Sequence, residues 1–489
     1  MDNTIYKTRN PLREVEPIAT INRIIGSPLG VCLLGLLTFL SFAFSMEVVF
    51  YTFVVIYTIY VGVFAKDLKP LMPLFIFCYI APSAINNPGK NANGIFFGST
   101  GLYLGAILSV AVVVLFVRIV FDRQMGLRRL LGTKRTLLPG ILALGASYFL
   151  SGILHPQYAE YAKNNLIFAA VQFASVFLLY YVFSATIHWD DFDWDYFATI
   201  GLVMGLVVTA ELATIYWSNN IVVNGMLSHE SLYSVYTGWG GKNNIAAIIG
   251  MSIPFAFYFA CRKKHPTVFL MIACLLLVSV IFSGSRGSMI GAAIAFVLSF
   301  IYTFIKSENK VEFRLVSILL FGVAGVLLWS FRDQLPLIYK DFPTIIVFYE
   351  GSIIIHDANR LDYIVNGIKV FFRNPIFGQS FYPVEYELTT FIETPELLSF
   401  FPPRWHNTIV QMMASCGIVG IVAYLYHRVS TIKLYLRNRT RENTYLAFYI
   451  AAFVAMSLFD CHFFNVGPVL FYSMALAVAE FGSDSSEYA

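Results

Sequence analysis

The stretch PTVFLMIACLLLVSVIFSGSRGSMIGAAIAFVLSFIYTF, residues 266–304, decides the fold. It consists of two long apolar runs that are separated only by the short polar segment Ser283–Ser288. A helix needs about 20 apolar residues to cross a bilayer, so each run has the length and composition of a membrane helix. The polar segment has room only for a turn. The sequence therefore predicts a tight membrane-helix hairpin here.

Apolar runs of this kind recur along nearly the whole chain. Of its 489 residues, 58% are hydrophobic and 13% charged, whereas soluble domains carry about 25% charged residues. The runs that could form membrane helices are 29–46, 48–65, 68–85, 99–121, 137–154, 165–187, 196–217, 245–260, 266–283, 287–305, 313–331, 405–426, 444–461 and 463–481. The first and the last pair have tight connections, so either pair is two crossings or one broken helix. We expect an all-α polytopic integral membrane protein with about 12–14 transmembrane helices.

These runs also set the expected domain organisation. A long extracytoplasmic loop at 332–404 interrupts the membrane helices, which occupy 29–331 and 405–481, between a cytoplasmic N-terminal segment at 1–28 and a cytoplasmic tail at 482–489. Within the loop, apolar residues recur at near-helical spacing at Leu361, Ile364, Val365, Ile368 and Phe372. Because basic residues occupy other positions of the same stretch, the pattern predicts an amphipathic helix on the membrane surface.

The distribution of positive charge predicts the orientation, because cytoplasmic loops carry the excess of Lys and Arg. With the N-terminus in the cytoplasm, most of the 33 lysines and arginines fall in inside segments. The short outside loops hold only Lys90, Lys163, Lys242 and Arg286. One predicted inside segment, His188–Asp195, is acidic and aromatic instead and is an exception to the pattern.

Four polar clusters fall together on the predicted outer side, namely Gly238–Asn244, Ser283–Ser288, Asn359–Asp362 and Arg404–Asn407. Arg286 is the most informative residue, because an unpaired charge at a membrane turn is costly and needs an anionic partner. The glycine and serine residues around it expose backbone N–H groups at the start of a helix, where phosphates commonly bind. A snorkelling arginine at the membrane interface is the alternative interpretation.

The other basic residues of these clusters also have two interpretations. Arg360 is either an anion ligand or a surface cation of the amphipathic helix, and Lys242 and Arg404 either join the same anion site or contact lipid headgroups. His406 lies at the outer end of an apolar run, two residues after Arg404. An imidazole held neutral by neighbouring arginines can act as a base toward an alcohol. Asn407 is expected to cap the helix that follows.

The sequence gives no indication of a metal site, a cofactor or a nucleic-acid partner. The six cysteines lie in or beside apolar runs without the close spacing of a zinc site. His155, His229 and His356 also fall on the outer side, but none of them begins a helix beside an arginine. The basic residues do not form a stripe interleaved with aromatic residues, as a nucleic-acid interface requires.

From about Gly238 to Gly420 the chain resembles the O-antigen ligase and O-antigen polymerase superfamily, bacterial membrane glycosyltransferases that use lipid-linked glycans. The resemblance rests on motifs in family order: Gly-Lys-Asn-Asn at 241–244, Ser-Arg-Gly at 285–287, Arg360 followed by Asn-Pro-Ile-Phe-Gly at 374–378, and His-Asn at 406–407 leading through Gln411 to Gly-Ile-Val-Gly at 417–420. The long outer loop lies where the family carries one.

The resemblance implies a GT-C-like fold in the bacterial cytoplasmic (inner) membrane, with the active site outside the cytoplasm. It also implies attack by an acceptor hydroxyl on a glycan carried by undecaprenyl diphosphate, without a metal or another cofactor. The implied partners are this donor, a glycan or lipid acceptor, and membrane lipids. We expect Arg286 and Arg360 to bind the diphosphate with help from Lys242 and Arg404, and His406 to deprotonate or orient the acceptor hydroxyl.

Several alternatives remain. The sequence does not separate a ligase from a polymerase, although basic residues beside the outer loop would suit a second diphosphate and favour a polymerase. A flippase or transporter of lipid-linked glycans would need a polar path through the bilayer. Intramembrane acids that would form one are scarce, with Glu211 deepest in an apolar run and Asp460 at the edge of another. A peptidoglycan polymerase would use a similar donor, but it fits the His-Asn helix start less well.

Overall fold

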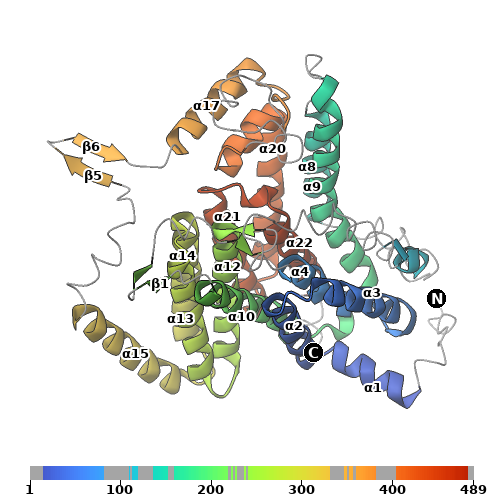
Figure 1. The fold of residues 1–489 in the computed structure, drawn as a ribbon, viewed down its shortest axis with the longest axis vertical. Coiled ribbons are helices and arrows are strands. Elements are labelled where there is room, and N and C mark those ends of the chain that lie inside the picture. The colour runs from blue at the N-terminus through green and yellow to red at the C-terminus, as the bar shows by residue number, and fades with distance from the viewer. Residues whose placement is uncertain are drawn as a thin grey trace.

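The computed structural model describes residues 15–81, 109–110, 113–118, 136–151, 159–218, 222–223, 226–227, 236–237, 240–330, 346–349, 352–355, 360–381 and 404–482 (Figure 1). The α-helices of this part of the chain are α1 (Glu16–Ile25), α2 (Pro28–Ala43), α3 (Glu47–Phe64), α4 (Met72–Ile80), α8 (Leu138–Leu150), α9 (Ala159–Thr186), α10 (Trp194–Ser218), α12 (Lys242–Arg262), α13 (Pro266–Phe282), α14 (Arg286–Lys306), α15 (Lys310–Ser330), α17 (Arg360–Arg373), α20 (Thr408–Arg437), α21 (Arg441–Ser457) and α22 (Val466–Phe481).

Short elements connect these helices. The 3-10 helices are η2 (Lys69–Leu71), η5 (Trp189–Asp191) and η6 (His462–Phe464). The strands form antiparallel pairs, β1 (Val222–Val223) with β2 (Met226–Leu227), β3 (Tyr236–Thr237) with β4 (Gly240–Gly241), and β5 (Ile346–Tyr349) with β6 (Ser352–Ile355). Helices therefore make up nearly all of the secondary structure in the described residues.

Most of the helices fall in the apolar runs that the sequence predicts to cross the membrane; α1 precedes the first of these runs, and α17 lies within the predicted long loop. In the described residues, six helices are long and apolar enough to span a bilayer, or seven if α1 and α2, bent by 73°, form one span, and four shorter apolar helices accompany them. Among the described residues the bent pair is α1 and α2, and neither the first nor the last pair of predicted runs is a bent pair of this kind. The predicted run 99–121 lies mostly outside the described residues. The chain is a polytopic all-α membrane protein, and the total of 12–14 crossings stays a prediction.

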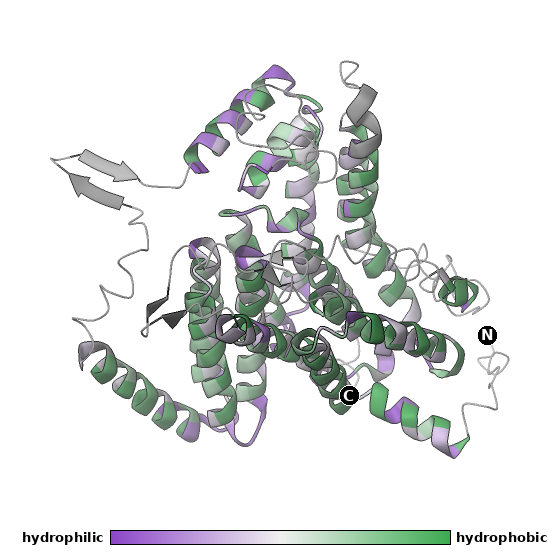
Figure 2. Cartoon of the chain, viewed as in Figure 1, coloured by the Kyte–Doolittle hydropathy of each residue, from purple (hydrophilic) through white to green (hydrophobic). Residues whose placement is uncertain are grey.

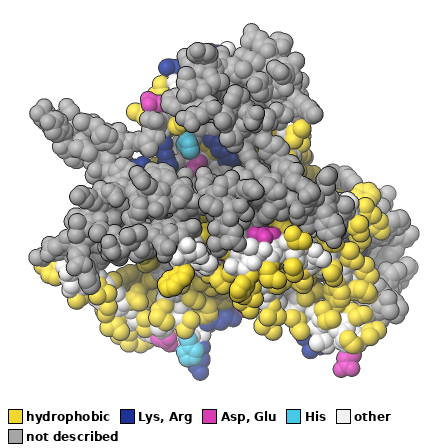
Figure 3. Space-filling model, viewed as in Figure 1, with side chains coloured by type: hydrophobic (Ala, Val, Ile, Leu, Met, Phe, Trp, Pro, Cys, Tyr) yellow, Lys and Arg dark blue, Asp and Glu magenta, His cyan; other side chains and the backbone are white. Residues whose placement is uncertain are grey.

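The hydropathy of the surface agrees with a membrane setting. Figure 2 shows hydrophobic residues along the lengths of the helices and hydrophilic residues mainly at their ends. In Figure 3, a band of hydrophobic side chains lies directly above charged side chains at the lower edge, and further charged side chains and a histidine lie higher on the same face. Apolar side chains on α15, such as Ile318 and Leu319, are exposed. Contact with lipid would bury them.

Helix α12 is the centre of the bundle, and nearly all of its residues are buried. It packs against α10, α13, α14 and α21. Small residues allow this close packing: a Cβ on Gly201 would lie 2.3 Å from Phe255, and one on Gly250 would lie 2.5 Å from Met456. Small residues at helix interfaces are the usual means of close packing in membranes. This packing fixes the N-terminal ends of α12 and α14, where two of the predicted site residues lie.

The acidic segment His188–Asp195 has a clear structural role at one end of the bundle. Asp195 lies 3.0 Å from Arg262 and 2.6 Å from Lys263, the basic residues at the end of α12. The acidic segment and the basic residues after α12, both predicted to lie inside, are therefore neighbours, and their charges neutralise each other. Their contact agrees with the charge pattern that placed both segments on the same side.

Helix α20 is broken at Gly417, whose φ of 63° and ψ of −156° are not helical. The segment 374–381, which follows α17, fills the break with its backbone. The backbone hydrogen bonds across the break are Ile418 N to Pro375 O, Val419 N to Ile376 O, Gln379 N to Ala414 O, and Ser380 N to Ser415 O. The segment thereby satisfies peptide groups that the break would leave unpaired in the membrane. Two of the sequence motifs, at 374–378 and 417–420, are thus the two halves of one structure.

Two glycines make this contact possible. Gly378 and Gly417 both have positive φ, 71° and 63°, a backbone region that side chains with a Cβ rarely adopt. A Cβ on Gly417 would lie 2.4 Å from the Ile376 oxygen, and one on Gly378 would lie 2.3 Å from the Ser415 carbonyl carbon. Both positions therefore require glycine for conformation and for space.

Candidate functional site

The connection between α21 and α22, residues 458–465, is the meeting point of five described helix N-termini. Helix α22 follows it directly. Asn243 of α12 and Arg360 of α17 donate hydrogen bonds to it, and so does Asn407, the N-cap of α20. Gly287 of α14 lies against Phe459. Each helix N-terminus carries partial positive charge from unpaired N–H groups. The 458–465 segment is therefore surrounded by helix ends that favour an anion.

Asp460 is the carboxylate at the middle of this segment, and only 8% of it is exposed. It accepts hydrogen bonds from Asn243 Nδ2 at 2.8 Å and from the Cys461 N–H at 2.6 Å. Burial raises the pKa of Asp460, but its neighbours, His406 and the Cys461 N–H among them, lower it by a larger amount, so the pKa stays well below its usual range. Asp460 is thus a buried anion at neutral pH.

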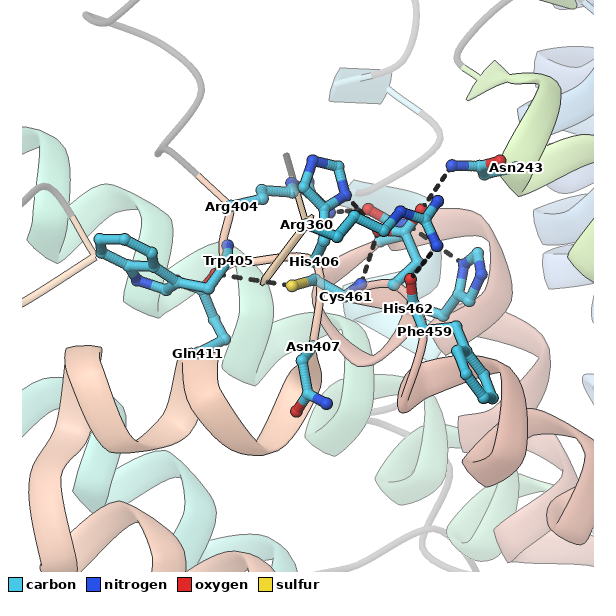
Figure 4. A network of polar contacts seen from close by, with 12 residues as sticks. Asn243, Arg360, Arg404, Trp405, His406, Asn407, Gln411, Phe459, Cys461 and His462 are labelled. Carbon is cyan, nitrogen blue, oxygen red and sulfur yellow. Dashed lines mark hydrogen bonds and ion pairs between the residues drawn. The ribbon is translucent and has the colours of Figure 1, made fainter. Parts of the chain in front are cut away.

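His406 lies directly beside Asp460, with its Nδ1 atom 3.5 Å from Asp460 Oδ1 (Figure 4). Its side chain remains about one-third exposed, at 33%. The backbone of His406 has a φ of 49°, a left-handed conformation in which histidine is enriched among non-glycine residues. An Nδ1 atom directed at a carboxylate leaves Nε2 as the nitrogen available to a substrate.

The residues on either side of His406 anchor the start of α20. Asn407 caps the helix, as the sequence predicts, because its Oδ1 accepts from the N–H groups of Ile409 and Val410 at 2.9 and 3.1 Å. Trp405 is fully buried, and its backbone N–H donates to Gln411 Oε1 at 3.1 Å. His406 is therefore held between two fixed neighbours, and Figure 4 shows the Trp405 side chain pointing away from Arg360 and His462.

The predicted basic residues converge on the same place. Arg286 and Arg360 lie close enough to Lys242 for their positive charges to act on it. Arg360 donates from Nη1 to the Phe459 carbonyl oxygen at 3.0 Å, and Arg404 donates to Asn465 Oδ1. The structure thus brings together all five residues that the sequence selected, on α12, α14, α17 and the start of α20.

A family model described as O-antigen ligase matches residues 270–425. This region of the chain is similar to the O-antigen ligase domain. The match bears out the resemblance to the O-antigen ligase and polymerase superfamily, and it supports a role in surface polysaccharide biosynthesis for a membrane enzyme of the glycosyltransferase type. The search of curated proteins found no match.

The O-antigen ligase domain does not contain the whole cluster. It includes Arg286, Arg360, Arg404 and His406, whereas Lys242 precedes it and Asp460 follows it. The cluster is completed by helices on both sides of the matched region. The matched region alone therefore lacks the carboxylate next to His406.

Sequence reasoning missed two side chains beside the O-antigen ligase motifs. Asp460 was noticed only as an acid at the edge of an apolar run, and His462 was not considered. The signal was the polar content of Asp-Cys-His-Phe-Phe-Asn, 460–465, between two apolar runs. Burial lowers the pKa of His462, and Arg404 and Arg360 lower it further against the opposing effect of Asp460. His462 is therefore a buried neutral imidazole, whose Nδ1 lies 3.3 Å from Asn465 Nδ2.

The described part of the chain holds no group of three or more His, Cys, Asp and Glu side chains arranged to bind a metal ion. His155, His229 and His356 lie outside the described residues. The candidate site itself presents a histidine paired with a carboxylate, next to several cations and helix N-termini.

Proposed function

We propose that the chain transfers a glycan from undecaprenyl diphosphate to an acceptor hydroxyl on the extracytoplasmic face of the bacterial cytoplasmic membrane. The observation that carries this proposal is the position of His406, 3.5 Å from the Asp460 carboxylate and beside the predicted cations. Asp460 is the positioning residue that holds the imidazole with Nδ1 inward. The O-antigen ligase domain supports the reaction class.

In the proposed step, Nε2 of His406 accepts the proton of the acceptor hydroxyl. The acceptor oxygen forms a bond to the anomeric carbon of the donor glycan from the face opposite the diphosphate. The bond between that carbon and the phosphate oxygen breaks, and its electron pair leaves with undecaprenyl diphosphate. The anomeric centre is inverted. General base catalysis of this kind contributes about 100-fold or more to a rate.

The leaving diphosphate gains negative charge as the bond breaks. We assign Arg286, Arg360 and Lys242 to stabilise this charge, because hydrogen bonds from cations to phosphate are short and strong. The surrounding helix N-termini add fixed positive potential. These groups carry the role that a divalent cation has in other transferases, so we expect the rate of the purified protein to be unchanged by EDTA. A rate that falls with EDTA and recovers with added Mg²⁺ would contradict this part of the proposal.

The amphipathic helix α17 provides the proposed contact with the leaflet that holds the donor tail. Leu361, Val365 and Phe372 are exposed on one stripe of the helix, and Lys369 flanks it. The opposite side packs on α20, where Gly367 lies against Val410. Such a stripe suits insertion into the membrane interface. Arg360, the first residue of α17, would then meet the diphosphate at headgroup level.

The acceptor is proposed to be a second lipid-linked glycan, which makes the enzyme a polymerase. Arg404 supports this choice, because it adds a further cation, hydrogen-bonded to Asn465, to the cluster of Lys242, Arg286 and Arg360. A second diphosphate could use this additional cation. Product that remains on undecaprenyl diphosphate would support a polymerase, whereas product on a different lipid would show a ligase.

Turnover of a lipid-linked glycan by purified protein tests the site. We expect His406→Ala to lower kcat by about 100-fold or more, and Arg286→Ala and Arg360→Ala to lower kcat/KM for the donor. Matched controls at the other end of the bundle are His265→Ala and Arg314→Ala, both at exposed residues, which should keep the wild-type rate. Wild-type turnover by all three site variants would show that the site is assigned wrongly.

A further inference from the structure

The contacts of His406 with Asp460 leave the orientation of its ring incompletely determined. The 3.5 Å separation from Asp460 is longer than a hydrogen bond of good geometry. The side chain is also one-third exposed, so solvent and substrate can reach the ring. A base in this position needs a second contact that fixes the plane of its imidazole.

Tyr363 of α17 supplies such a contact. The Tyr363 and His406 ring centroids are 5.2 Å apart, and the rings are tilted by 57°. This separation is within the usual range for interacting aromatic rings, about 4.5–7 Å. Tyr363 is three residues after Arg360 in the same helix, so both side chains lie on one face of α17. One helix face therefore presents a cation and a ring to the site.

The position of Tyr363 is itself fixed by the way α17 rests on α20. Tyr363 packs against the small buried cluster of Val370, Trp405, Val410 and Ala414. One turn farther along α17, a Cβ on Gly367 would lie 2.4 Å from Val410 and 3.0 Å from Trp405. The two helices are thus as close as a glycine allows. A displacement of α17 would move Tyr363 away from His406.

We propose that Tyr363 is a positioning residue for His406: its ring holds the imidazole in the orientation that directs Nδ1 at Asp460. This orientation then depends on the packing of α17 against α20. This inference rests on the proposed function, since it assigns His406 as the base. When α17 packs against α20, Arg360 reaches the diphosphate and Tyr363 aligns His406 at the same time.

The experiment measures kcat and KM of purified protein with a lipid-linked glycan for Tyr363→Phe, Tyr363→Leu and Tyr363→Ala. We expect Tyr363→Phe to keep near-wild-type kcat, because it retains the ring. Tyr363→Leu retains apolar volume without the ring. We expect Tyr363→Leu and Tyr363→Ala to lower kcat about 10-fold, with little change in the KM for the donor. Tyr426→Leu, at an exposed tyrosine of α20, is the matched control and should behave as wild type.

Three results would overturn the inference: full kcat in Tyr363→Leu, an equal loss in Tyr363→Phe and Tyr363→Leu, or an effect confined to KM. The last result would make Tyr363 a substrate contact. His406→Ala in the same assay separates this inference from the proposed function. If His406→Ala is fully active, the proposed base is wrong, whereas an inactive His406→Ala with an active Tyr363→Leu contradicts only the role of Tyr363.

Discussion

Two histidines lie next to Asp460, and they differ in exposure. His462 is buried, with 1% exposed, and the side chain of His406 is about one-third exposed, at 33%. A base must be reached by the acceptor hydroxyl, so His406 suits this role and His462 suits a structural role. The exposed histidine is also the one that contacts α17 through Tyr363. At the residue scale, accessibility therefore distinguishes two side chains of the same chemistry.

The low pKa of Asp460 has a consequence for stability. Its folded pKa lies below the unfolded value of about 3.9, so its contribution is fully present above about pH 4 and is lost as the pH falls below that value. We expect Asp460→Asn to unfold at a lower temperature than wild type at pH 7, by about 1 °C for each kcal/mol of stability lost in a chain of this length. This difference should narrow as the pH falls below about 4.

Thermal unfolding in detergent, followed by tryptophan fluorescence, measures both effects. Asp362→Asn removes an exposed carboxylate of α17, and it should leave the unfolding temperature at pH 7 unchanged. If the difference in unfolding temperature between wild type and Asp460→Asn stays constant from pH 7 to 3, the neighbours of Asp460 do not stabilise its ionised carboxylate.

At the scale of elements, backbone hydrogen bonds join the 374–381 segment to the broken helix α20 on both sides of Gly417. Gly417 and Gly378 have positive φ, and a Cβ on either would clash with backbone atoms. We expect Gly417→Ala and Gly378→Ala each to destabilise the protein by about 1–3 kcal/mol, the usual cost of a strained backbone, with a further cost from the clash.

Gly322 provides the matched control, because a Cβ there would meet nothing within 4 Å. Gly322→Ala lies within α15 and should leave stability unchanged or raise it, since alanine favours helix over glycine by about 1 kcal/mol. Unfolding temperatures of the three variants in one detergent test this prediction. Equal unfolding temperatures for all three would show that the break in α20 tolerates a side chain.

The element scale also shows what a sequence can and cannot reveal. Hydropathy predicted most helices of the described chain, amphipathic spacing predicted α17, and the residue type predicted the cap at Asn407, because all three depend on local residues; α1 was not predicted. The motifs at 374–378 and 417–420 were recognised only as signatures, since their hydrogen bonds join segments about 40 residues apart. Asp460 was missed for the same reason. The sequence around a single acid at the edge of an apolar run does not indicate its neighbours. Asn243 and His406 reach Asp460 only in the folded structure.

For the whole molecule, the charge pattern and the packing agree on two opposite polar ends. The predicted outer residues Asn243, Arg360 and His406 meet at the 458–465 segment, and the predicted inner residues Asp195 and Arg262 meet at the other end of α12. A bundle with the site at one end and paired charges at the other suits an enzyme that works on one face of a membrane.

Thiol labelling in intact cells tests the orientation. In a variant without the six native cysteines, Asp362→Cys and Lys264→Cys place single thiols at exposed positions on opposite ends. We expect a membrane-impermeant maleimide to label position 362 in intact cells and to label position 264 only after permeabilisation. The reverse pattern would place the site on the cytoplasmic face and exclude the proposed topology.

The break in α20 also limits how this protein can be recombined. Because the 374–381 segment and the residues around Gly417 satisfy each other's peptide groups, neither half can be exchanged for that of another enzyme without its counterpart. A chimera that aims to change the acceptor should therefore cut after Phe381 and before Arg404, so that the native junction is kept. The exchanged segment would then leave the hydrogen bonds between 374–381 and α20 intact. Helix α20, which follows His406, would keep its native packing.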